Sequence, residues 1–108
     1  MLSLEEKNIK ILIELGLTYR EAKIYYTLNR LGEITIKDLA ENAHMDRPNI
    51  YGVIKKLQKL NLIEQIIDSP VSYKAVPLEQ CVQMLLEQKA HNASIHRSGM
   101  KILFARTN

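Results

Sequence analysis

Nitrogen-bearing side chains are concentrated in one segment that contains no carboxylate. From Arg47 to Lys59 the sequence carries one arginine, one asparagine and three lysines, without any aspartate or glutamate. Cationic side chains at this density neutralise phosphates, and an arginine or an asparagine can pair in a bidentate manner with the edge of a guanine or an adenine. The segment therefore indicates a surface that faces nucleic acid. A solvated, lysine-rich helix face is the alternative that charge alone leaves open.

The same segment has the periodicity of a helix with one apolar side. At about 100° per residue, that side is formed by Ile50, Val53, Ile54, Leu57 and Leu60. The residues that we expect to contact DNA from the other side and its flanks are Arg47, Pro48, Asn49, Tyr51, Gly52, Lys55, Lys56 and Lys59. The arginine and the asparagine lie near the N-terminal end, so we expect them to read base edges, whereas the lysines are expected to contact phosphates.

Two of these residues have a second interpretation. Gly52 lowers helix stability by up to about 1 kcal/mol relative to alanine. Either DNA approaches closely at this position, or the glycine is simply tolerated on an exposed face. The hydroxyl of Tyr51 could donate to a phosphate, or the ring could be a half-buried packing residue.

The elements around this helix predict a winged helix-turn-helix. A short helix from Ile36 to Ala43 precedes the turn His44-Met45-Asp46, and the aspartate is a suitable N-cap for the next helix. Two β-prone runs, Leu62–Ile67 and Val71–Val76, then predict a hairpin. Helix, tight turn, helix and hairpin in this order define the fold, which places its second helix in a major groove.

Two helices precede this unit. The first is predicted from Leu4 to Leu15, and the second begins at a capping box formed by Thr18 and Glu21. The second helix runs to about Leu31 and carries two apolar stripes, which is typical of a central helix that is buried on two sides.

Four further DNA contacts are expected from neighbouring elements. Thr35 and Lys37 begin the short helix, whose N-terminal amides favour a phosphate. Ser72 and Lys74 lie on the second hairpin strand and are expected to touch the DNA backbone beside the groove.

The remaining reactive side chains form no recognisable catalytic or metal site. Cys81, His91 and His96 match no zinc spacing, and no nucleophilic triad or glycine-rich phosphate loop occurs. We expect no enzyme activity, no metal and no cofactor. A single cysteine, 46% hydrophobic residues without a long apolar run, and a net charge of +3 predict a cytoplasmic protein that does not bind membranes.

Several short motifs, taken in order, resemble the TrmB-type sugar-responsive transcription regulators, which are best known in archaea. They are Leu15-Gly16-Leu17-Thr18, Glu21-Ala22-Lys23-Ile24-Tyr25, Leu31-Gly32-Glu33, Lys37-Asp38-Leu39-Ala40-Glu41, Ile50-Tyr51 with Leu57, Leu62-Ile63-Glu64 and Tyr73-Lys74-Ala75-Val76-Pro77. The resemblance covers roughly residues 14–87. It implies a winged helix-turn-helix, DNA as the partner and a helix after the wing that pairs two subunits.

The chain also departs from the family pattern. His44 stands where the family usually has glycine in the inter-helix turn, and Asp68-Ser69-Pro70 replaces a basic wing tip. Histidine tolerates positive φ better than most residues, so the turn can be kept. The long C-terminal sugar-binding domain of full-length members is absent from these 108 residues, so no sugar effector is expected.

The segment after Pro77 is predicted to be a helix that makes the protein a homodimer. Its apolar positions recur at helical and heptad spacing. They are Leu78, Val82, Leu85, Leu86, Ala93, Met100 and Leu103. The alternative is that the first turns pack back on the preceding domain.

Together these patterns predict a mainly α protein with a small β-hairpin. Residues 1–77 would form the winged helix-turn-helix and residues 78–108 a C-terminal helical dimerisation segment. The function predicted is sequence-specific binding of double-stranded DNA in transcription regulation. A winged-helix module that docks on a protein of the transcription machinery and a non-specific DNA-coating protein are the alternatives.

Overall fold

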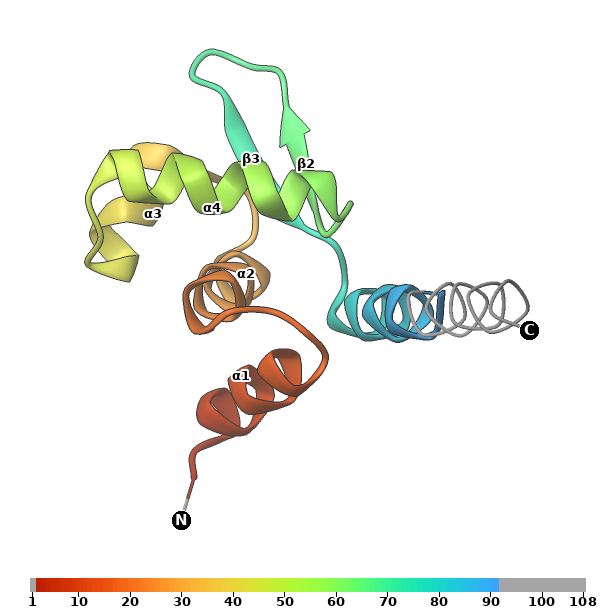
Figure 1. Ribbon diagram of the computed structural model, residues 1–108. Helices are drawn as coiled ribbons and strands as arrows, with labels where there is room; N and C mark the ends of the chain where they lie inside the picture. The colour runs from red at the N-terminus through yellow and green to blue at the C-terminus, as the bar shows by residue number, and fades with distance from the viewer. Residues whose placement is uncertain (1, 92–108) are drawn as a thin grey trace, which may run out of the picture.

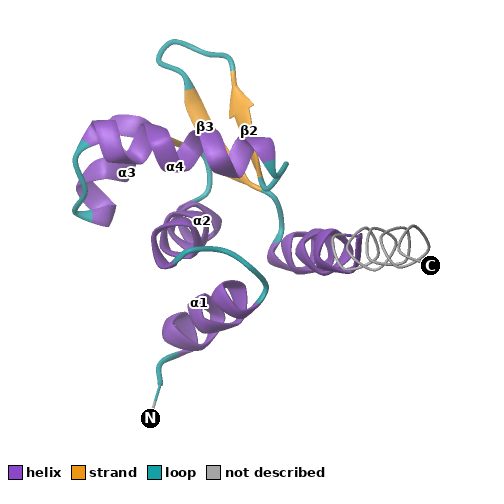
Figure 2. Ribbon diagram, in the orientation of Figure 1, coloured by secondary structure: helices purple, strands orange, loops and turns teal. Residues whose placement is uncertain are grey.

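The computed structural model describes residues 2–91, which form helices around a small antiparallel sheet (Figures 1 and 2). The elements are α1 (Leu4–Glu14), α2 (Tyr19–Leu31), β1 (Ile34–Thr35), α3 (Ile36–Ala43), α4 (Arg47–Lys59), β2 (Ile63–Ile66) and β3 (Ser72–Ala75). A further helix occupies residues 78–91 of the described chain and is called here the C-terminal helix. This architecture confirms the predicted fold class.

Local hydrogen bonds explain where the helices begin. Thr18 and Glu21 form the predicted capping box, in which the backbone N–H of Thr18 donates to Oε1 of Glu21 at 2.9 Å and the backbone N–H of Glu21 donates to Oγ1 of Thr18 at 3.2 Å. Oγ1 of Thr35 caps α3 by accepting from the backbone N–H of Asp38. The α3–α4 turn passes through His44 at φ 53°, so the histidine does take the left-handed conformation that the turn requires.

The sheet has one strand more than a hairpin. The strand order is β1-β3-β2, and both pairings are antiparallel. Ile34 of β1 pairs with Tyr73 of β3 and thereby attaches the start of α3 to the wing. As a result, the wing and the helix-turn-helix share backbone hydrogen bonds as well as side-chain contacts.

The core lies on both sides of α2, with α4 on one side and α1 on the other (Figure 1). Tyr25 and Leu28 are fully buried on α2, and Ile50, Ile54 and Leu57 fill the space from α4. These are three of the five residues that the periodicity placed inward. Val53 and Leu60 are half-buried against the same core.

The C-terminal helix packs on this core in its first two turns. Cys81 is 0% exposed and Leu85 only 4% exposed, so the winged domain continues past the predicted boundary at Pro77. Leu85 was predicted to lie in the dimer seam, and that placement is wrong because its side chain completes the domain's own core. Of the other predicted dimer residues, Ala93, Met100 and Leu103 lie outside the described residues.

Burial also controls the chemistry of Cys81. It raises the pKa of the Cys81 thiol to about 11, while a hydrogen bond with Tyr25 acts weakly in the opposite direction. The thiolate is the reactive form of cysteine, and at neutral pH this thiol is both protonated and covered.

We therefore expect Cys81 in the folded protein to resist a thiol-specific reagent at pH 8. Reaction should require unfolding, so the same reagent should modify the chain promptly in denaturing urea. The readout is unambiguous because the chain has a single cysteine. Fast modification of the folded protein would show that the C-terminal helix does not pack on the domain.

Candidate nucleic-acid interface

The outer face of α4 presents all the side chains that the sequence assigned to it. Arg47, Pro48, Asn49, Tyr51, Gly52, Lys55, Lys56 and Lys59 are exposed in the structure. The helix contains no acidic residue, and its N-terminus begins directly after the tight turn. The part of the helix that faces away from the core therefore carries cationic and amide side chains and no carboxylate.

A depression of about 330 Å³ joins α4 to two other elements. Thr35 and Lys37 line it from the start of α3, Arg47 and Tyr51 from α4, and Val71 from the wing, with Ile36, Pro70 and Tyr73 completing the lining. Four of the predicted DNA-contacting residues therefore meet at one place. A depression with two cations and a phenol hydroxyl beside a helix N-terminus has the chemistry to hold a phosphate.

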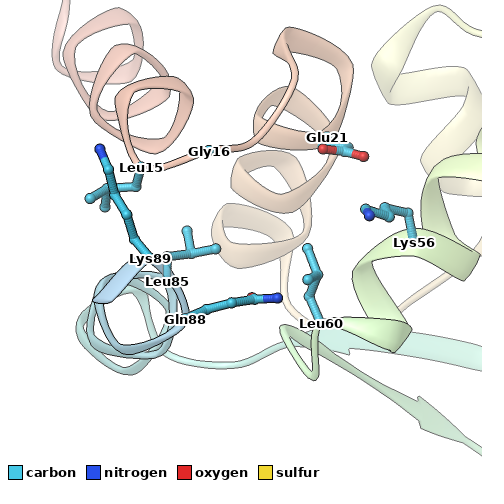
Figure 3. A pocket seen from close by; sticks show the side chains of 8 residues that line it. All are labelled: Leu15, Gly16, Glu21, Lys56, Leu60, Leu85, Gln88 and Lys89. Atoms are coloured by element: carbon cyan, nitrogen blue, oxygen red, sulfur yellow. The ribbon is translucent and has the colours of Figure 1, made fainter. Parts of the chain in front are cut away.

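Lys56 lies on a different flank of α4. It lines a second depression of about 250 Å³ together with Glu21 and Gln88, between α4 and the C-terminal helix. Figure 3 shows its side chain extending from α4 toward Glu21 of α2. The three lysines of the predicted surface are therefore not equivalent, because Lys56 shares its surroundings with a carboxylate.

The hairpin residues are divided between buried and exposed positions. Ser72 is only 5% exposed and donates its hydroxyl to Oε1 of Glu33 at 2.7 Å. The expectation that it touches the DNA backbone is therefore corrected: its hydroxyl holds the β1–β3 edge together. Lys74 is exposed as expected, and it stands directly opposite Glu64 in the β2–β3 register.

The wing tip is apolar and acidic. Ile67 is 82% exposed, and the carboxylate of Asp68 accepts a hydrogen bond from the backbone N–H of Ser69. Behind the tip, Gln58 of α4 donates to Gln65 of β2 at 3.2 Å. The wing is thus fixed to α4, but from Ile66 to Val71 it offers no cation to a phosphate.

A contact that the sequence did not reveal lies at the N-terminal end of α4. Asp46 occupies the N-cap position as predicted, yet its side chain makes no capping hydrogen bond. Its Oδ1 instead accepts from Nδ2 of Asn49, one turn along the helix. The spacing of three residues was the available signal, but it fits a capping interaction equally well.

No metal-binding group competes with this interface among residues 2–91. No cluster of three or more histidine, cysteine or acidic side chains gathers there. In the same part of the chain, no helix has the length and apolar character that crossing a bilayer demands.

A short helix, a tight turn, a helix with an acid-free outer face and an attached wing define a winged-helix DNA-binding regulator. The sequence profile of the sugar-specific transcriptional regulator TrmB family matches residues 12–79. The chain therefore belongs to the TrmB family. A comparison with curated protein sequences gives no match.

Solved structures share the fold at low sequence identity. TrmBL2, an archaeal chromatin protein whose structure is described as showing a novel mode of DNA binding, aligns with a TM-score of 0.84 and 18% identity over 96% of this chain and 40% of its own. The chain thus spans less than half of that protein. The multiple antibiotic-resistance repressor MarR from Listeria monocytogenes aligns with a TM-score of 0.57 and 18% identity, over 89% of this chain and 66% of its own. The oxidised form of MarR from E. coli aligns with a TM-score of 0.59 and 13% identity, over 99% of this chain and 96% of its own.

The surroundings of Gly52 generate a prediction about its role. A Cβ built at this position meets no atom within 4 Å. Gly52→Ala should therefore stabilise the isolated protein by up to about 1 kcal/mol, because alanine loses less backbone entropy in a helix. Urea unfolding monitored by circular dichroism measures this change.

Measuring DNA affinity on the same variant separates the two interpretations of the glycine. Weaker DNA binding by the stabilised protein would favour a close approach of DNA, and unchanged binding would favour a tolerated exposed glycine. A less stable variant would contradict the open surroundings of this position.

Proposed function

We propose that this chain is a sequence-specific regulator that binds double-stranded DNA as a homodimer, with α4 in the major groove. The observation that carries the proposal is the convergence of Thr35, Lys37, Arg47 and Tyr51 on one depression beside the acid-free face of α4. Phosphate contacts at that depression would fix the register of the helix, and side chains at its N-terminal end would reach base edges.

One alternative has a specific observation behind it. TrmBL2 is described as a chromatin protein, and an architectural protein of this kind can bind without reading sequence. The balance of charges in the present chain, 15 basic and 12 acidic residues, favours a selective regulator over a general DNA coat. The expectation that no sugar acts as an effector stays a prediction.

Selection of duplexes from a random pool, carried out at two salt concentrations, tests the proposal. We expect one motif to be enriched at both concentrations. Binding without enrichment of a motif would indicate a non-specific DNA-coating protein instead of a sequence-specific regulator. Absence of binding at low salt would favour a module that docks on another protein.

The enriched duplex then distinguishes the lysines of α4. Log affinity falls linearly with log salt, with a slope of about 0.9 for each phosphate neutralised. Lys55→Ala should reduce this slope by about one unit, since Lys55 is exposed on the outer face. Lys56→Ala is the matched control and should change the slope less, since Lys56 lines the depression that contains Glu21. Equal effects of the two variants would mean that both lysines contact phosphates.

The homodimer is supported by an apolar surface formed by α1 and the C-terminal helix. Leu78 and Val82 line a depression of about 390 Å³ together with Ile11 and Leu12 of α1. Ile11 is 46% exposed, and Leu86, one helical turn after Val82, is 50% exposed. A surface with protruding and recessed apolar side chains side by side can match a second copy of itself across a two-fold axis.

The position of this surface suits DNA binding by two subunits. α1 lies on the opposite side of α2 from α4 and the wing (Figure 1). Pairing through α1 and the C-terminal helix would leave both α4 helices accessible. A two-fold dimer then reads two half-sites about one helical turn of DNA apart, whereas one subunit reads only a few base pairs.

We expect Leu86→Glu and Ile11→Glu each to weaken the dimer strongly, because each places a charge in an apolar contact. Light scattering at tens of micromolar protein gives the mass directly. Ile67→Glu on the wing is the control, since it alters an even more exposed isoleucine far from this surface. A full chain that is monomeric without any substitution would contradict the proposed dimer.

A further inference from the structure

Asp46 is an acidic residue at the N-cap of α4, the end of the helix that the proposed function places in the major groove. A carboxylate there is unexpected, because it repels phosphate. Nor is it needed for capping, since its side chain accepts no backbone hydrogen bond from the helix. Its oxygen is instead used to bind the side-chain amide of Asn49. Both residues are exposed, so the pair is open to a partner.

This hydrogen bond fixes which way round the carboxamide of Asn49 lies. The NH₂ group faces the carboxylate, and the carbonyl oxygen Oδ1 is directed away from it. If the carboxamide turned by 180°, Oδ1 would face the Asp46 oxygens and the charge-assisted hydrogen bond would be replaced by repulsion. An isolated surface asparagine has no such constraint and can present either end to a base.

The constrained carboxamide has a definite set of free hydrogen-bonding groups. One N–H of the NH₂ group is taken by Asp46, so one N–H donor and the acceptor Oδ1 remain. Adenine offers N7 as an acceptor and its N6 amine as a donor in the major groove, which matches this set. Guanine offers two acceptors, N7 and O6, which a free NH₂ group could meet with both of its N–H donors, whereas the carboxamide held by Asp46 has only one N–H left.

We propose that Asp46 is a positioning residue that makes Asn49 select adenine and reject guanine at one position of the DNA site. This inference rests on the proposed function. In this inference the carboxamide of Asn49 makes the contact with the base, and the carboxylate of Asp46 fixes the orientation in which that carboxamide is presented. The pair adds selectivity at a cost in phosphate attraction, a cost that the four cations of α4 offset, since the helix itself carries no acidic residue.

The test uses the duplex that the selection experiment enriches. Asn49→Ala first identifies the position that Asn49 reads, as the one at which the base preference collapses. At that position the wild-type chain should prefer adenine to guanine by about 5- to 150-fold, the range expected for one good bidentate contact. Asp46→Asn keeps the size of the side chain, but its amide can donate or accept, so Asn49 can turn. That variant should lose most of the preference.

Two further variants separate positioning from structure and from charge. Asp46→Ser lacks the carboxylate but is a good N-cap residue, so it should also lose the preference while α4 remains stable. Asp68→Asn removes the same charge from the wing without touching Asn49, and it should keep the adenine preference. A general loss of folding would lower affinity for all bases alike and leave their ratio unchanged.

The outcomes are distinct for this inference and for the proposed function. If the wild-type chain enriches no motif, sequence-specific binding fails and the inference fails with it. If a motif appears and Asn49→Ala alters no position, or if Asp46→Asn and Asp46→Ser keep the full adenine-to-guanine ratio, the inference alone is overturned. A selected guanine at the position read by Asn49 would overturn it as well.

Discussion

The buried hydroxyl of Tyr25 is the point at which the separate parts of the domain are joined. It donates to the backbone carbonyl of Val76, fifty-one residues along the chain, and the ring itself is fully buried in α2. Burial is also the main cause that raises the pKa of this phenol, with Cys81 as the next contribution. A buried phenol needs a hydrogen-bond partner, and only a correctly placed wing exit supplies this one. The helix-turn-helix, the wing and the C-terminal helix therefore depend on one another.

This connection determines which surfaces remain available for partners. α2 is covered by α4 on one side and by α1 on the other, so neither neighbour can bury its whole circumference against the core. α4 leaves a face of cations and amides, and α1 leaves apolar side chains such as Ile11 beside the C-terminal helix. The two exposed faces therefore differ in chemistry: the face of α4 matches a polyanion, and the face of α1 matches an apolar surface.

Features determined by neighbours in sequence could be predicted well. Capping residues such as Thr18 and Glu21 and the inward positions of α4 depend on hydrogen bonds and periodicity within a few residues. Contacts between distant segments could not be predicted. Ser72 and Tyr73 are adjacent and both buried, so strict alternation along β3 does not reveal where each side chain lies. An apolar leucine at position 85 fits a partner subunit as well as its own core, and only the packing of distant segments in the folded chain decides between them.

The burial of Leu85 also changes how a dimer would act on DNA. Had the whole apolar stripe been free, the C-terminal helix could have moved relative to the DNA-binding elements. Cys81 and Leu85 instead fix it to the core, and Nζ of Lys89 donates to the carbonyl of Glu14 at the end of α1, 3.3 Å away. In the proposed dimer, the distance between the two α4 helices is then set by packed contacts rather than by a flexible connection. Spacing between half-sites would be read as strictly as the bases themselves, because a fixed separation matches only DNA sites whose centres lie at the corresponding helical repeat.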